Sequence, residues 1–232
     1  MNTPTVSVVI PAYNEEENIG DILLRTNATL ETIGVPYEII VVDDGSVDET
    51  RFMAMRYKVT VLSNGTNRGK GYALKKGIQN ANGSILITMD ADGSHRPEDI
   101  PKLLVPLLNG ADVVFGSRFI GKRGQESTKK LHIFGNKLFN LLVILLTGRH
   151  VTDSQTGFRA YKKKIIEEIE ISSNGYEVET ELTVKSLRNG YIIHEEPITF
   201  ERRKDGSSHL NPLFDGIKIF KTIVRAGINA RK

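Results

Sequence analysis

Short apolar runs alternate with longer amphipathic stretches through the first half of the chain. Five of these runs are rich in branched aliphatic residues and end at polar or glycine-containing turns, so we expect strands at 5–10, 37–42, 59–62, 85–89 and 111–115. The stretches between them predict helices at 14–33, 46–57, 72–80 and 97–108. This alternation predicts an α/β fold, in which a Rossmann-like, mostly parallel sheet has helices on both faces.

The second half of the chain departs from the simple alternation. We expect helices at 129–147, 162–169 and 177–188 and short strands at 158–161 and 191–200, with polar loops at 121–127 and 201–209. Residues 212–232 are basic and place Ile217, Phe220 and Ile223 at helical spacing, which predicts an amphipathic helix. One globular unit is therefore expected over 1–210, followed by a C-terminal helix over 211–232.

Polar side chains follow the expected strands at four places: Asn14–Glu15, Asp43–Asp44, Asp90 with Asp92, and Ser117–Arg118. The carboxyl ends of parallel strands meet at one edge of an open α/β sheet, where ligands bind. On an extended segment Asp90 and Asp92 project to the same side, so their carboxylates could share a divalent cation. An Asp-x-Asp-Gly sequence is also a common polar turn, but turns and helix caps explain all four places together poorly.

The composition narrows the possible chemistry. The 232 residues carry a net charge of +3 at pH 7, which is too small to indicate a nucleic-acid partner. The chain has no cysteine, which excludes thiol catalysis and thiolate zinc sites and fits a reducing compartment. Neither a signal peptide nor an apolar run of about 20 residues is evident, so a soluble or membrane-surface protein is expected.

Six short motifs occur in an order and at spacings that resemble one enzyme family. They are VVIPAYNE at 8–15, VDDGS at 42–46, NRGKG at 67–71, DAD at 90–92, GSR at 116–118 and GFRA at 157–160. The ordered set resembles the family 2 glycosyltransferases with the GT-A fold, in particular the dolichyl-phosphate mannose synthases and their polyprenyl-phosphate glycosyltransferase relatives. The resemblance extends over residues 6–210, which is nearly the whole chain.

The resemblance implies transfer of a hexose from a nucleotide diphosphate sugar to polyprenyl or dolichyl phosphate, with inversion at the anomeric carbon. Mannose from GDP-mannose is the first expectation. The alternatives are glucose from UDP-glucose and a family 2 enzyme that glycosylates a growing glycan. A nucleotidyltransferase is disfavoured, because the acidic segment Glu15–Glu17 stands where such an enzyme carries a glycine-rich basic loop.

The resemblance also assigns residues to the donor. The nucleotide sugar would contact Pro11, Tyr13, Glu15, Asp43, Asp44, Lys70, Asp90, Ala91, Asp92, Arg203 and His209. Asp43 would lie at the base and Asp44 near the ribose or base, whereas Asp90 and Asp92 match the motif in which Mg²⁺ or Mn²⁺ bridges the diphosphate. Some relatives add a metal-binding glutamine at the position that Ser94 occupies here. Arg203 and His209 belong to a loop that closes over the phosphates.

The acceptor is already an anion, so it needs cationic positioning more than a strong general base. Arg118 matches the acceptor-phosphate arginine of the family, and Lys130 is a second candidate. The expected catalytic residues are Asp92, Arg118, Asp153 and Glu181. Asp153 and Glu181 match acidic positions that would hold sugar hydroxyls or orient a basic side chain. Glu181 could equally be one of several glutamates on a solvated helix face.

Two stretches suit a membrane surface. Residues 138–146 are apolar nearly all round, and 212–232 combine an apolar face with a basic one, as helices do that lie on anionic lipid. The alternative for both is that they pack on the domain. We expect peripheral association with the cytoplasmic face of a membrane, either directly or through an anchoring partner protein.

Overall fold

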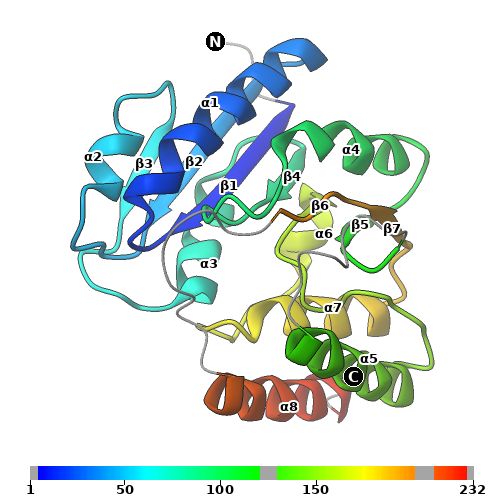
Figure 1. The fold of residues 1–232 in the computed structure, drawn as a ribbon. Coiled ribbons are helices and arrows are strands. Elements are labelled where there is room, and N and C mark those ends of the chain that lie inside the picture. The colour runs from blue at the N-terminus through cyan, green and yellow to red at the C-terminus, as the bar shows by residue number, and fades with distance from the viewer. Residues whose placement is uncertain (1–4, 121–129, 202–211, 229–232) are drawn as a thin grey trace.

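The computed structural model describes residues 5–120, 130–201 and 212–228 (Figure 1). The first half of the chain contains β1 (Val6–Ala12), α1 (Glu16–Ile33), β2 (Tyr37–Asp43), α2 (Thr50–Ala54), β3 (Thr60–Ser63), α3 (Lys70–Asn80), β4 (Ile85–Thr88), the 3₁₀ helix η1 (Pro97–Asp99), α4 (Ile100–Leu108) and β5 (Val113–Ser117). The second half contains α5 (Lys130–Thr147), β6 (Arg159–Lys162), α6 (Lys163–Glu168), α7 (Val178–Arg188), β7 (Ile193–Pro197) and α8 (Pro212–Ile228). Every expected element is present, with small shifts at the ends.

The strands form one seven-stranded sheet in the order β3-β2-β1-β4-β6-β5-β7. β1 pairs in parallel with β2 and β4, and β5 pairs in parallel with β7. β6 is antiparallel to both β4 and β5, so the mostly parallel sheet that the sequence predicts is confirmed. Because β6 runs the opposite way, its first residue, Arg159, lies opposite Thr88 and Phe115, at the edge where β4 and β5 end.

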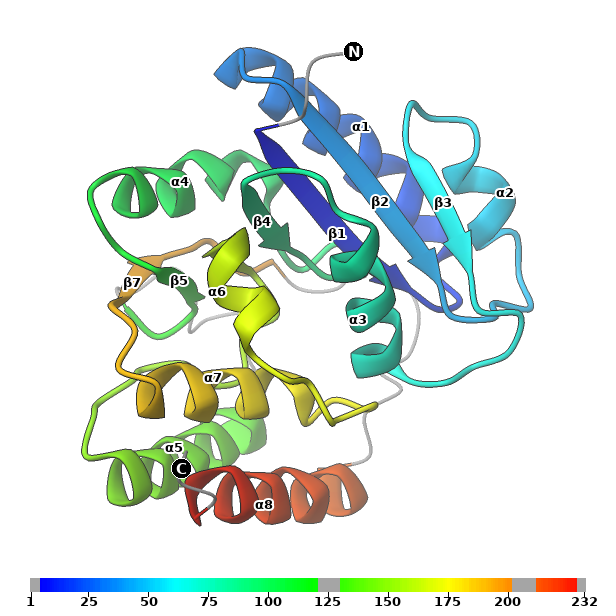
Figure 2. The same ribbon diagram turned by 180° about the vertical axis from the view of Figure 1, so that it is seen from behind.

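The sheet has a hydrophobic core on each face. Successive residues of a strand point to opposite faces, and in β1 Val8 and Ile10 belong to one core while Val9 belongs to the other. Helices α1, α2 and α4 cover the first face, and α3, α6 and α7 cover the second (Figure 2). Both faces of the central strands are buried, which explains why they appear in the sequence as continuous apolar runs.

Helices α5 and α8 lie side by side beyond α7 and form an outer layer on the second face (Figures 1 and 2). The C-terminal helix is amphipathic as expected, but its buried stripe is Ile219, Ile223 and Ala226. Ile217 and Phe220 are about half exposed. None of the described helices is long and apolar enough to cross a lipid bilayer.

Candidate active site

The loops that follow β1 and β2 are tied together at the carboxyl edge of the sheet. Asn14 has a left-handed backbone conformation with φ of 54°. Its N–H donates to Ser46 Oγ at 3.0 Å, and its side-chain oxygen accepts from the N–H of Val47 at 3.0 Å. The N–H of Glu15 donates to Thr50 Oγ1 at 2.7 Å. Residues expected to border the nucleotide therefore stand on two joined loops.

Both aspartates at the end of β2 are buried and engage their neighbours. Asp43 accepts from the N–H of Ser46 and from Ser63 Oγ, each at 3.1 Å. Asp44 accepts from the amide of Asn64 at 2.7 Å. In this structure the two carboxylates hold the loops that follow β2 and β3, and their roles at the base and ribose stay predictions.

Asp44 also sets the start of α3. Its carboxylate accepts from the backbone N–H groups of Arg68 and Gly69, the latter at 2.7 Å. Gly69 has φ of 97°, and a Cβ there would lie 2.4 Å from the carbonyl oxygen of Asn174, so only glycine fits. The NRGKG motif therefore works as a tight turn that delivers the next residue, Lys70, to the sheet edge.

Lys70 bridges two carboxylates from distant parts of the chain. Its Nζ lies 2.6 Å from Asp90 Oδ1 and 2.7 Å from Glu179 Oε1. Burial opposes both charges of the first pair, but the two carboxylates raise the pKa of Lys70, and Lys70 lowers the pKa of Asp90. The pKa of Glu179 is raised, because burial outweighs its attraction to Lys70.

The second aspartate of the DAD motif is differently placed. Asp92 is half-buried, and its Oδ1 accepts from the N–H of Ser94 at 3.0 Å and from its hydroxyl at 2.6 Å. The described residues give Asp92 Oδ2 no hydrogen-bond donor, whereas Asp90 is engaged by Lys70. No group of three or more metal-binding side chains occurs in the described parts of the chain. A divalent cation would therefore fit at Asp92 with most of its oxygen ligands supplied by a bound diphosphate and water.

His95 lies beneath the DAD motif. It is 2% exposed and stacks on the ring of Phe158 with centroids 5.3 Å apart. Burial lowers the pKa of His95, so the ring is neutral and its Nδ1 accepts from the N–H of Asp90 at 3.3 Å. Gly157 packs directly against Asp90. A Cβ at this position would lie 2.7 Å from an oxygen of Asp90, so a larger residue would displace the carboxylate.

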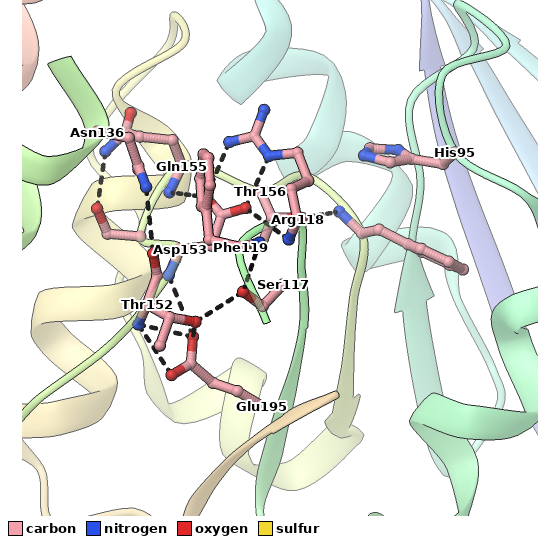
Figure 3. Close-up of polar contacts among 12 residues, drawn as sticks. His95, Ser117, Arg118, Phe119, Asn136, Thr152, Asp153, Gln155, Thr156 and Glu195 are labelled. Carbon is pink, nitrogen blue, oxygen red and sulfur yellow. Dashed lines mark hydrogen bonds and ion pairs between the residues drawn. The ribbon is translucent and has the colours of Figure 1, made fainter. Parts of the chain in front are cut away.

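Arg118, directly after β5, is held by Asp153 (Figure 3). Nε donates to Asp153 Oδ2 at 2.7 Å and Nη2 to Oδ1 at 2.8 Å, and the backbone N–H of Arg118 adds a third bond at 3.2 Å. Asp153 is fully buried. Burial opposes the charge of Arg118, but Asp153 raises its pKa. The guanidinium also packs near the rings of Phe119 and Phe200, at 5.4 and 5.2 Å from their centroids.

Glu181 lies elsewhere on α7 and is neither solvated nor grouped with these residues. Its carboxylate is 1% exposed and accepts from the N–H and hydroxyl of Ser172, the N–H of Ser173 and Nζ of Lys185. Burial opposes ionisation, but these donors lower the pKa of Glu181 to about 2. Its contacts are those of a residue that secures the loop before α7.

The structure gives fewer contacts for the remaining residues that the sequence predicts at the site. Pro11 lines a cavity of about 10 Å³ beside Lys70 and Asp90, and Ala91 is buried. Lys130 is the first residue of α5, and nothing is described of its side chain. Arg203 and His209, which the sequence predicts at the phosphates, lie outside the described residues.

Sequence reasoning missed two groups in the site. Glu179 reaches Lys70 because α7 is oriented by Arg159, whose guanidinium donates to the carbonyl oxygens of Glu179 and Ser154 at 2.9 Å. His95 follows the DAD motif closely but belongs to none of the six motifs. Arg159 of the GFRA motif is a sequence signal for the placement of Glu179, because a buried arginine must be surrounded by hydrogen-bond acceptors.

The seven-stranded α/β sheet fits the class of GT-A glycosyltransferases. Its strand ends gather an Asp-x-Asp motif, a buried lysine and a carboxylate-held arginine. The model of glycosyl transferase family 2 matches residues 7–170, and the chain belongs to that family.

Two relatives and one solved structure illustrate what the chain is similar to in sequence and fold. The chain is 34% identical over 211 residues to the dolichol-phosphate mannosyltransferase of Pyrococcus furiosus, a match that covers 88% of this chain and 59% of that protein. It is 33% identical over 221 residues to the polyprenol monophosphomannose synthase of Mycolicibacterium smegmatis, covering 90% and 82%. The fold is similar to glucosyl-3-phosphoglycerate synthase from Mycobacterium tuberculosis, with a TM-score of 0.77, 22% identity and coverage of 99% and 80%.

Proposed function

We propose that this glycosyltransferase moves a hexose from a nucleotide diphosphate sugar to a polyprenyl phosphate such as dolichyl phosphate, with inversion at the anomeric carbon. The names of the two relatives support a lipid-phosphate acceptor and favour mannose as the sugar. GDP-mannose is the donor that we propose. Glucose from UDP-glucose is the alternative donor, because the described contacts of Asp43, with Ser46 and Ser63, favour neither base.

The observation that carries the proposal is the orientation of Arg118. Asp153 engages its Nε and Nη2, and the described residues give Nη1 no partner. A guanidinium held in this way presents its remaining donors as a fixed fork, which matches the geometry of a phosphate. Arg118 is also near enough to Asp90 to help lower its pKa, so an acceptor phosphate here would adjoin the donor site.

The donor end is built from Asp92 and the Lys70 bridge. Asp92 would hold Mg²⁺ or Mn²⁺ on the diphosphate, and such an ion stabilises the negative charge that develops on a leaving nucleoside diphosphate. Lys70 is paired with Asp90 and Glu179 at the same edge, so its charge balances these carboxylates. The negative charge of the phosphates would therefore be stabilised by the ion at Asp92 and by the guanidinium of Arg118.

The chemistry needs no strong base. An acceptor phosphate oxygen forms a bond to the anomeric carbon as the bond to the diphosphate breaks, and the nucleoside diphosphate leaves with the electron pair. A phosphate monoester is already largely ionised at pH 7, because its second pKa is about 6. Arg118 would hold this oxygen in line with the breaking bond, which is the entropic part of the rate enhancement.

The outer layer of helices supports membrane contact. Leu138, Leu141 and Leu145 are exposed on α5, and the neighbouring α8 exposes Phe214, Ile217, Phe220 and Ile228. Exposed lysines and an arginine accompany them, at Lys137, Lys218, Lys221 and Arg225. Adjacent apolar and basic groups suit an anionic lipid surface. We therefore propose peripheral association with the cytoplasmic face of a membrane, directly or with an anchoring partner.

A donor panel tests the function. The protein is incubated with Mn²⁺ or Mg²⁺, dolichyl phosphate and labelled GDP-mannose, UDP-glucose or UDP-N-acetylglucosamine, and the label in an organic extract is counted. Label from GDP-mannose is expected. If only UDP-glucose gives label, the proposed donor changes to UDP-glucose and the proposed acceptor stands. If no donor gives label, the proposal is overturned.

A further inference from the structure

The loop that carries Asp153 is held from the β7 side by Glu195 (Figure 3). The carboxylate of Glu195 accepts from the N–H of Thr152 at 2.9 Å, from its hydroxyl at 2.7 Å and from the N–H of Asp153 at 3.1 Å. The hydroxyl of Thr152 also lies 2.6 Å from Ser117 Oγ, on the residue before Arg118. Through the Thr152 hydroxyl, Glu195 thus links the loop that carries Asp153 to the end of β5, where Arg118 follows.

The same loop is held from the opposite side by α5. The amide of Asn140 donates to the carbonyl oxygen of Thr152 at 2.7 Å and accepts from the N–H of Ser154 at 3.1 Å. The amide of Asn136 donates to the same carbonyl at 3.2 Å. Both asparagines are buried in a helix that is otherwise mostly apolar. A buried amide is costly unless it is bonded, and Asn140 uses both its nitrogen and its oxygen on the loop, which explains its presence here.

We propose that Glu195 and Asn140 are positioning residues that act through Asp153 to aim Arg118 at the acceptor phosphate. This inference rests on the proposed function. Neither residue has a hydrogen bond or ion pair with Arg118, and together they bond the backbone of each residue from Thr152 to Ser154. Asp153 can place its two oxygens on Nε and Nη2 only while this backbone stays in register with the end of β5.

The chain supplies a conservative variant that separates positioning from charge. Glu195 Oε1 receives all three donors of Thr152 and Asp153. Glu195→Gln keeps an oxygen at that position and should resemble the wild type. Glu195→Leu removes the acceptor at similar size and should raise the acceptor KM about tenfold to a hundredfold, as a displacement of the order of 1 Å does, with the donor KM nearly unchanged. Asn140→Leu should give the same split.

A second readout needs no substrate. Arg118 Nε–H donates to Asp153 at 2.7 Å and should exchange slowly with water in the ¹⁵N spectrum of the wild type, where its signal is identified by its absence in Arg118→Lys. Exchange should accelerate at least about tenfold in Glu195→Leu and stay slow in Glu195→Gln. Should Glu195→Leu not fold, Thr152→Val, which removes only the shared hydroxyl, replaces it with the same expectation.

Glu196→Leu is the matched control, because Glu196 is the next residue of β7 and its side chain pairs with His194 instead of the loop. Wild-type exchange and an unchanged acceptor KM in both Glu195→Leu and Asn140→Leu would overturn the positioning role. So would an equal rise in the donor and acceptor KM. Absence of lipid-linked product from the wild type would overturn the proposed function instead, and the exchange measurement would still decide whether Glu195 positions Arg118.

Discussion

The ammonium group of Lys70 lies 2.6 Å from Asp90, the first aspartate of the DAD motif. Lys70 also pairs with Glu179. Asp90 is therefore part of a buried ion-pair cluster, and the two aspartates of the motif have different roles. Lys70 joins three segments of the chain through Asp90 and Glu179, and Asp92 keeps an oxygen for a ligand. The DAD motif predicts two equivalent metal ligands, and the geometry distinguishes them.

Asp92→Ala should abolish transfer without unfolding the protein. Asp92 is half-buried and bonds only Ser94 among the described residues, so its loss should change the free energy of unfolding by no more than about 0.5 kcal/mol. Turnover should fall at least about a hundredfold, because the charge on the leaving diphosphate loses its cation. Turnover with Mn²⁺ and urea unfolding check both parts. Ser94→Ala keeps the carboxylate and should stay active; full activity of Asp92→Ala would exclude the metal role.

Lys70→Met should instead destabilise the fold. The substitution leaves Asp90 and Glu179 facing each other without the buried cation between them, a change that costs about 3–5 kcal/mol in comparable pairs. Urea unfolding measures the loss. Adding Glu179→Gln to Lys70→Met should recover part of it. Lys75→Met removes a cation of the same helix that hydrogen-bonds the Asn174 side chain, and it should cost much less. Equal stability of Lys70→Met and the wild type would contradict the bridge.

Much of this site follows from local patterns in the sequence. Apolar runs that end in Asp43, Asp90 and Arg118 identify strand ends, and parallel pairing then places those ends at one edge. The antiparallel β6 was not anticipated, because a short strand carries no signal for its direction. The site residues that could be predicted are therefore those that stand next to a strand end.

The rest depends on how distant elements pack. The sequence shows three glutamates near the start of α7 but not which one faces the sheet, and that rotation brings Glu179 to Lys70 and sends Glu181 to Ser172. Likewise, Glu195 reaches Thr152 only because β7 pairs with β5 at the sheet edge. Neither the Glu179–Lys70 contact nor the Glu195–Thr152 contact leaves a local pattern in the sequence. The two residues of each pair are more than about a helix length apart in the chain.

Leu141→Glu with Leu145→Glu should weaken binding to anionic vesicles. Both leucines are exposed on α5, and each would contribute about 1.5–3 kcal/mol if buried in lipid. The partition coefficient between vesicles and water should therefore fall by roughly a hundredfold. Sedimentation with phosphatidylserine vesicles measures it. Leu108→Glu is the control, because Leu108 is 75% exposed on α4, across the sheet from α5. An unchanged bound fraction would exclude α5 from the membrane surface.

Glu181 should make the protein sensitive to acid. Its folded pKa of about 2 lies below its ordinary value of 4.5, so its contribution to stability is complete above pH 4.5 and is lost as the pH falls toward 2. A shift of that size corresponds to about 3 kcal/mol. Relative to Glu181→Gln, the wild type should therefore lose about 3 kcal/mol more of unfolding free energy between pH 6 and pH 2.

The measurement is urea unfolding of both proteins at several pH values, with the difference between them isolating Glu181 from other carboxylates. Lys185→Met should show a smaller pH dependence than the wild type, because it removes the first of the contacts that lower the pKa and leaves the donors of Ser172 and Ser173 in place. Parallel pH profiles for wild type and Glu181→Gln would mean that the carboxylate is not held in its ionised form. The segment before α7 would then need another explanation for its order, since Ser172 and Ser173 direct their N–H groups at this carboxylate.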